Sequence, residues 1–178
     1  MALDDPIPLA YTLCFLTRGS QVLMLHRRYP PNQGLWNGVG GRIEPGETPL
    51  ACILREVQEE TGYNLESVHF GGIVTWLGFE PSTGIETQPG QTPPGGLPPG
   101  GLYLYQAEAP AGEPAQSNEG ELAWRPLEWV LSSRAVVSNI PIFIPHLLED
   151  HPPQEYAFNY QNGAIHSYAF NPLPNWVM

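Results

Sequence analysis

The stretch that decides the fold runs from Gly41 to Tyr63 and reads GRIEPGETPLACILREVQEETGY. Its middle is best explained as a helix. Thr48 supplies a hydroxyl for the N-cap, and Pro49 suits the first helical position, where no backbone N–H is needed. Gly62 is placed to end the helix, because glycine readily adopts the left-handed conformation that closes one.

Three carboxylates on this helix are spaced to share one face. Glu56, Glu59 and Glu60 stand at i, i+3 and i+4, so they project toward one patch. Carboxylates this close repel one another, and a hard divalent cation with oxygen ligands removes the conflict. The opposite side is expected to dock on a core and comprises Leu50, Ile53, Leu54, Val57 and Thr61.

The spacing of these residues resembles the Nudix box, G-x5-E-x7-R-E-U-x-E-E-x-G-U, in which U is apolar. The matching positions are Gly41, Glu47, Arg55, Glu56, Val57, Glu59, Glu60 and Gly62. Tyr63 departs from the pattern, which usually has an aliphatic residue there. A solvated acidic helix face would explain the carboxylates, but it predicts neither the glycines nor Arg55 at these spacings.

The resemblance implies an α+β Nudix fold, a mixed sheet sandwiched between helices, and an enzyme that cleaves diphosphate bonds with Mg2+, or with Mn2+ in its place. Such a metal neutralises phosphate oxygens and lowers the pKa of a bound water. Glu56, Glu59 and Glu60 are the expected metal ligands, and the resemblance adds the backbone carbonyl of Gly41. One of the three glutamates is expected to be the general base, and the resemblance favours Glu56 or Glu60.

Arg55 has a different expected role, because a guanidinium has no atom that can ligate a cation. Flanked by acids, it is expected to hold a carboxylate in place by a two-pronged hydrogen bond. Glu47 is the expected partner.

Substrate recognition must come from outside the box. Leu35–Gly41 (LWNGVGG) resembles the MutT branch, particularly enzymes that clear oxidised purine nucleoside triphosphates, where an asparagine at the position of Asn37 bonds the base. A turn-forming asparagine is the alternative. Val137–Pro141 (VSNIP) is similar to bacterial 8-oxo-dGTP diphosphatases, so Asn139 is expected to contact a purine edge. The alternative is that Ser138 or Asn139 caps a helix.

Direct cationic contacts with phosphate must come from arginine or histidine, because the chain contains no lysine. Arg27 and Arg28 lie at the end of a predicted strand, where MutT-like enzymes carry a phosphate-binding arginine. Arg42 follows Gly41 directly. These three arginines are the expected phosphate contacts, with a solvated strand end as the alternative for the first two.

A further metal ligand is expected after the box. Asn118–Trp124 (NEGELAW) resembles the loop that supplies a late metal-binding glutamate in the MutT branch. Counting back from Trp124 favours Glu119, with Glu121 as the alternative. An exposed acid before a strand would be the ordinary explanation for either residue.

Composition narrows the class of protein. The chain has 178 residues, 42% of them hydrophobic, and is expected to form a single domain over residues 1–178. Its net charge of −11 argues against binding a nucleic-acid polymer. No secretory signal and no membrane-spanning segment is expected. Cys14 and Cys52 are predicted to be reduced core residues of a cytoplasmic protein.

The rest of the chain is mostly strand-like, so α+β is the expected class. A second helix is predicted over residues 141–150, and a hairpin is predicted around Asn162 and Gly163. Residues 80–101 are rich in proline and glycine and are predicted to form a long loop within the domain. The strands are expected at residues 11–17, 22–26, 73–79, 102–107, 124–127, 156–160 and 165–170.

The leading hypothesis is Mg2+-dependent hydrolysis of a purine nucleoside triphosphate, such as 8-oxo-dGTP, to a nucleoside monophosphate and pyrophosphate. Residues 136–140 lack the tryptophan and aspartates of human-type enzymes, so preference for an oxidised base stays open. One alternative is another nucleoside diphosphate derivative, such as ADP-ribose or a dinucleoside polyphosphate. The other is a non-catalytic nucleotide-binding module.

Overall fold

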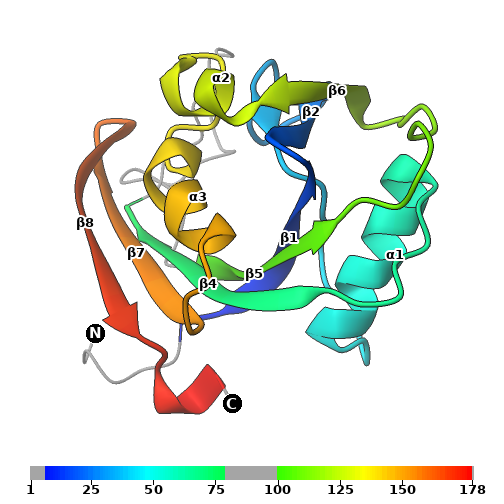
Figure 1. The fold of residues 1–178 in the computed structure, drawn as a ribbon. Helices are drawn as coiled ribbons and strands as arrows, with labels where there is room; N and C mark the ends of the chain where they lie inside the picture. The colour runs from blue at the N-terminus through cyan, green and yellow to red at the C-terminus, as the bar shows by residue number, and fades with distance from the viewer. Residues whose placement is uncertain (1–6, 79–99, 178) are drawn as a thin grey trace.

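In the computed structural model, which describes residues 7–78 and 100–177, one mixed β-sheet lies between α1 on one side and α2 and α3 on the other (Figure 1). This arrangement confirms the expected α+β class, with a mixed sheet between helices. No helix in the described residues is long and apolar enough to cross a membrane. The elements in chain order are β1 (Leu9–Arg18), β2 (Gln21–Arg27), β3 (Trp36–Asn37), α1 (Pro49–Thr61), β4 (His69–Leu77), β5 (Gly100–Glu108), β6 (Gly120–Pro126), α2 (Leu127–Ser132), α3 (Ile140–Leu148), β7 (Gln154–Gln161), β8 (Ala164–Pro172) and η1 (Asn175–Val177).

The strand order is β3-β2-β1-β5-β4-β7-β8, and β6 also pairs with β2. The pairs β1·β5 and β4·β7 are parallel, and the other pairs are antiparallel. The predicted hairpin is present as β7 and β8. It closes through Asn162 and Gly163, whose φ angles of 52° and 74° are those a tight hairpin turn requires.

Helix α1 begins and ends where the sequence predicts. The Thr48 hydroxyl accepts a hydrogen bond from the Ala51 N–H at 3.1 Å. Gly62 adopts φ 76° and its N–H donates to the carbonyl of Gln58 at 2.8 Å. Tyr63, which departs from the box pattern, is buried against α1, and its hydroxyl donates to the Gly112 carbonyl at 2.6 Å. The aromatic ring therefore does the packing of the usual aliphatic residue and adds a bond to a distant loop.

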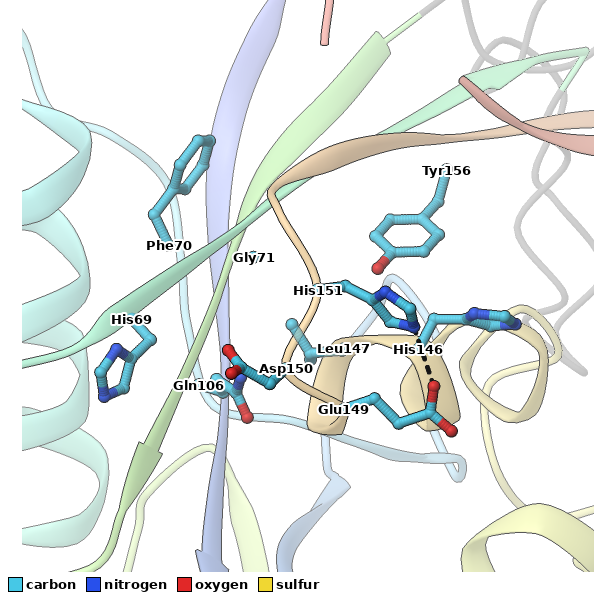
Figure 2. A pocket seen from close by; sticks show the side chains of 10 residues that line it. All are labelled: His69, Phe70, Gly71, Gln106, His146, Leu147, Glu149, Asp150, His151 and Tyr156. Carbon is cyan, nitrogen blue, oxygen red and sulfur yellow. Dashed lines mark hydrogen bonds and ion pairs between the residues drawn. The ribbon is translucent and has the colours of Figure 1, made fainter. Parts of the chain in front are cut away.

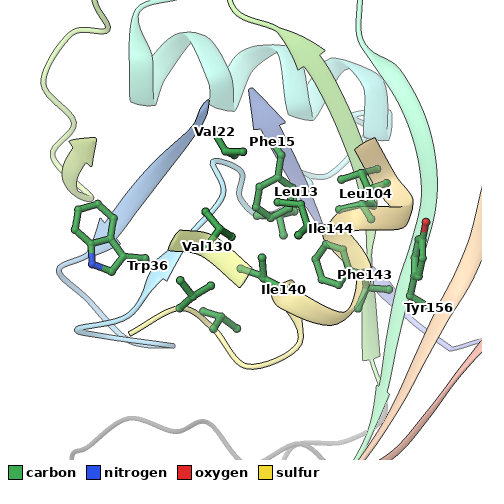
Figure 3. Packing of buried hydrophobic residues seen from close by; sticks show 14 of the residues in the cluster. Leu13, Phe15, Val22, Trp36, Leu104, Val130, Ile140, Phe143, Ile144 and Tyr156 are labelled. Atoms are coloured by element: carbon green, nitrogen blue, oxygen red, sulfur yellow. The ribbon is translucent and has the colours of Figure 1, made fainter. Parts of the chain in front are cut away.

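Two hydrophobic clusters cover the two faces of the sheet. The α1-side cluster includes Ile53 and Val57 of the helix, and both predicted core cysteines are buried and unpaired. The larger, α3-side cluster gathers residues of α2 and α3 with the opposite sheet face. Figure 3 shows apolar side chains of α3 directed toward those of β1 and β5. Each face thus has its own core, and the strands between them are fixed from both sides.

Three details differ from the sequence expectations. Helix α2 was not expected, because six residues are too few to display a helical period. Leu50 is 50% exposed rather than buried. The predicted loop over 80–101 lies outside the described residues, except that Gly100 and Gly101 already belong to β5.

Candidate active site

The carboxylates of α1 differ sharply in exposure. Glu60 is only 4% exposed, the Glu56 side chain is 14% exposed, and the Glu59 side chain is 55% exposed. Glu60 therefore belongs to the face of α1 that packs on the sheet, beside Val57 and Thr61. The three carboxylates therefore differ in how far each is withdrawn from solvent, and Glu60 is the most buried of them.

Arg55 holds several of these carboxylates at once. Its Nε donates to Glu47 Oε1 at 2.8 Å and its Nη2 to Glu47 Oε2 at 3.0 Å, which is the expected two-pronged pair. Its Nη1 donates to Glu56 at 2.7 Å and to Glu59 at 3.2 Å. This guanidinium lowers the pKa of Glu47 to about 2. Arg55 thus positions Glu56 while leaving Glu60 outside its reach.

Two glycines bring the chain close to the buried carboxylates. The Gly40 N–H donates to Glu60 Oε2 at 3.0 Å. A Cβ at Gly41 would meet the Glu56 carboxylate, so glycine here lets that side chain lie directly against the backbone. The Gly41 carbonyl accepts the Thr12 N–H at 2.8 Å and so faces β1. Gly41 remains a predicted metal ligand only through the second lone pair of that oxygen.

Burial raises the pKa of Glu60 to about 8, against the opposing effects of the Gly40 N–H and the positive charge of Arg27. The negative charges of Glu56 and Glu119 raise it further. Burial also raises the pKa of Glu56. Arg27 and Glu119 therefore lie close enough to Glu60 for their charges to act on it, whereas the alternative residue Glu121 is exposed on β6.

This donor set fits a divalent cation. It offers only oxygen ligands, and its most buried carboxylate lacks an ion pair with Arg55. Glu56 and Glu60, with Glu119 nearby, are the residues placed to hold such an ion. Glu59 is more exposed than either, and the ligand roles of Glu56, Glu59 and Glu60 all stay predictions.

A cavity of about 220 Å³ runs from these glycines across the α3-side face of the sheet. Its wall includes Gly40, Gly41, Arg27, Asn37 and Asn139. The rest of the wall is largely apolar and comprises Tyr11, Leu13, Pro31, Val74, Trp76, Leu102, Val137, Phe143 and Tyr160, with Thr12, Asn32 and Gly38. The cavity therefore connects Gly40 and Gly41, which lie beside the Glu60 and Glu56 carboxylates, with an apolar chamber whose wall carries three asparagine amides.

The predicted substrate residues divide into two groups. The cavity is lined by Arg27, Asn37 and Asn139. The other two, Arg28 and Arg42, are exposed and lie outside the cavity wall. The Nε of Arg27 is buried and has no hydrogen-bond partner. Asn37 Oδ1 accepts the Gly38 N–H at 2.8 Å, whereas Asn139 makes no side-chain capping bond to α3.

Four aromatic side chains of the cavity were not identified from the sequence as site residues: Tyr11, Trp76, Phe143 and Tyr160. Trp76 pairs across the sheet with Gly100, whose missing side chain leaves room for the indole, since a Cβ there would lie 3.0 Å from the ring. Burial raises the pKa of Tyr160 to about 12, and the neighbouring Ser138 and Asn139 side chains oppose that rise. Tyr160 and Asn139 thus lie side by side in the cavity wall.

Comparison with known proteins shows which family the chain belongs to. Residues 8–147 match the model of the NUDIX domain. The chain is 25% identical to the oxidized purine nucleoside triphosphate hydrolase of Danio rerio over 78% of each protein. It is 33% identical to the uncharacterized Nudix hydrolase YvcI of Bacillus subtilis, covering 64% of this chain and 63% of YvcI.

Among solved structures, a MutT mutator protein from Bacillus halodurans is similar with a TM-score of 0.69 and 28% identity. The match covers 92% of this chain and 98% of the other. It therefore extends beyond residue 147 into the β7–β8 hairpin. With the box residues assembled on α1 and the matching model spanning most of the sequence, the chain belongs to the NUDIX domain family and is a pyrophosphohydrolase of that family.

Proposed function

We propose that the protein hydrolyses a purine nucleoside triphosphate, 8-oxo-dGTP or dGTP, to the nucleoside monophosphate and pyrophosphate, with Mg2+ or Mn2+ as the metal. One observation carries the proposal. A single cavity connects Gly40, which bonds the buried carboxylate of Glu60, with an apolar chamber that contains Asn37 and Asn139. A purine triphosphate matches both parts of this cavity. Its phosphates, with their metal, suit the end beside Glu60, and its flat base suits the apolar chamber.

The apolar chamber supports a purine as the base. Trp76 and Phe143 offer aromatic surface for a flat ring system. An amide both donates and accepts hydrogen bonds, so Asn37 and Asn139 match the mixed donor and acceptor edge of a purine. The name of the Danio rerio relative points to the same substrate class for that protein.

Arg27 is proposed to bind the phosphates. Its buried Nε is an unsatisfied donor at the cavity wall, and leaving such a group without a partner is costly. A phosphate oxygen would satisfy it with a charge-assisted hydrogen bond. Arg28 and Arg42 are exposed, so the proposal assigns the contact to Arg27 alone.

Glu60 is proposed as the general base. A divalent cation, when bound, neutralises phosphate oxygens and lowers the pKa of a bound water. Glu60 is buried, and its raised pKa of about 8 makes its deprotonated carboxylate a stronger base than that of an ordinary glutamate. Glu56 is instead fixed by Arg55, which suits a ligand that must not move.

The proposed partner is a small-molecule nucleotide. A reducing compartment such as the cytoplasm is the proposed location, because Cys14 and Cys52 are both unpaired.

A substrate panel tests this function. The protein is incubated with Mg2+ and 8-oxo-dGTP, dGTP, dCTP or ADP-ribose, and products are separated by anion-exchange chromatography. We expect the highest kcat/KM for a purine triphosphate, with pyrophosphate and monophosphate as products. A higher kcat/KM for ADP-ribose, or release of inorganic phosphate and a diphosphate from dGTP, would contradict the proposal.

A further inference from the structure

A second group of metal-ligating side chains lies at the C-terminal end of α3. Among the described residues, His146, Glu149 and His151 each bring one ligand atom within 4.8 Å of the others. Figure 2 shows the three side chains gathered where α3 ends, with a dashed line joining His151 to Glu149. The α1 carboxylates do not take part in this group.

The backbone holds the three residues together. The Glu149 N–H caps α3 by donating to the Pro145 carbonyl at 3.2 Å, and the His151 N–H donates to the Glu149 carbonyl at 2.9 Å. Pro152 and Pro153 follow and restrict the backbone before β7 begins at Gln154. His151 is therefore turned back toward the helix end rather than carried away from it.

The side chains are also oriented before any ion arrives. His151 Nε2 lies 2.8 Å from Glu149 Oε2. The rings of His146 and His151 lie 5.9 Å apart between centroids, and His146 packs edge-on against Phe170 at 4.6 Å. Phe170 itself packs against the α3-side core, so one ligand ring is fixed by the fold.

The surroundings favour a cation. The C-terminal end of a helix carries partial negative charge on its last carbonyls, and this group of side chains lies at the C-terminal end of α3. A cavity of about 130 Å³ beside the three residues has Asp150 and Gln106 in its wall and no arginine. It has room for water molecules to complete a coordination shell. Glu149 and His151 are exposed, which gives an ion a path from solvent.

We propose that His146, Glu149 and His151 form a binding site for a borderline divalent cation of the Zn2+ class, which fastens the end of α3 to the loop entering β7. Two imidazoles and one carboxylate are ligands that Zn2+ accepts readily, whereas Mg2+ prefers oxygen alone. The site is therefore chemically distinct from the carboxylates of α1 and is independent of the proposed hydrolysis.

The site is tested by measuring zinc affinity in competition with a chromophoric chelator. Excess Mg2+ is present so that it occupies the α1 carboxylates. We expect one Zn2+ per chain in the wild type. His151→Gln and His146→Gln should weaken it by more than about tenfold, because each removes one of three protein ligands. The matched control is His166→Gln, since His166 is exposed on β8 and outside the group.

Two further readouts keep the test independent of folding defects. One equivalent of Zn2+ should shift the side-chain NMR signals of His146 and His151 in the folded wild type and leave His166 unchanged. It should also raise the Tm of the wild type and of His166→Gln, but not of His151→Gln. Zinc binding that is equally tight in all four proteins, or no Zn2+-induced shift of these two histidines, would overturn the proposal.

Discussion

The two sides of the sheet use polar groups in opposite ways. On the α1 side, carboxylates lie close together and one of them, Glu60, is buried at a cost mainly in lost hydration, to which repulsion by Glu56 adds. On the α3 side, a few amides stand in an apolar chamber lined by Trp76 and Phe143. The first arrangement suits chemistry on any diphosphate, and the second suits selection of one base. The comparison teaches that reaction and substrate are decided by separate parts of the molecule.

The largest expected effect comes from the α1 side. Glu60→Gln should lower kcat by roughly 10²- to 10⁴-fold for every triphosphate, because it removes the proposed base with little change in volume. The matched control, Glu66→Gln, alters an exposed glutamate beyond the helix and should keep the wild-type rate. Steady-state kinetics with dGTP and dCTP measure both. An unchanged kcat in Glu60→Gln would remove Glu60 from the mechanism.

Glu60 should also make the stability of the metal-free protein depend on pH. Its folded-state pKa of about 8 lies above the ordinary value of 4.5, so the folded state holds this proton more tightly than the unfolded state does. The resulting stability is fully present below pH 4.5 and is lost as pH rises through 8. We expect the free energy of unfolding to fall by up to a few kcal/mol over this window.

Urea denaturation in the presence of a chelator, at a series of pH values, measures this dependence. The metal-free Glu60→Gln protein should show a clearly smaller fall between pH 4.5 and 8, because the substituted amide does not titrate. Parallel curves for the two proteins would show that the carboxyl titrates normally in the folded state.

The neighbouring residues Arg27 and Arg28 test whether the phosphates are bound by one specific side chain at the cavity. Arg27→Gln should lower kcat/KM for triphosphates about tenfold to a hundredfold, since a hydrogen bond to a charged group contributes about 1.5–3 kcal/mol. Arg28→Gln is the matched control, because its side chain is exposed while that of Arg27 lines the cavity. Equal losses in the two variants would mean that general positive charge, not a specific contact, attracts the phosphates.

The smallest expected effect lies on the α3 side. Asn139→Ala should lower kcat/KM for dGTP by about three- to tenfold, as loss of one neutral hydrogen bond predicts, and leave that for dCTP nearly unchanged. Asn64→Ala, an exposed asparagine after α1, should change neither value. If the two triphosphates lose activity equally in Asn139→Ala, this residue does not read the base.

The difference between the α1 side and the α3 side also explains which features could be predicted from the sequence. Helix α1, its caps at Thr48 and Gly62 and the pair of Arg55 with Glu47 are local, so residue spacing alone identifies them. The burial of Glu60 could not be predicted, because it depends on the angle at which the helix docks. Leu50 was misassigned for the same reason.

The cavity wall is harder to predict because it is assembled from distant strands. Trp76 reaches the site only because β4 pairs with β5 opposite Gly100, and Tyr160 only because β7 pairs with β4. Single-sequence patterns do not specify such pairings. Asn37 and Asn139 were identified by resemblance, and the structure places both in one cavity.

The most direct test of the account is a crystal structure with Mg2+ and a non-hydrolysable purine triphosphate analogue. We predict that the base lies in the apolar chamber, within hydrogen-bond distance of Asn37 and Asn139. The phosphates should reach Arg27, with the metal on Glu56 and Glu60. A triphosphate bound at these carboxylates with its base in solvent, or a base in the chamber with its phosphates directed away from α1, would contradict the claim that one substrate spans both regions.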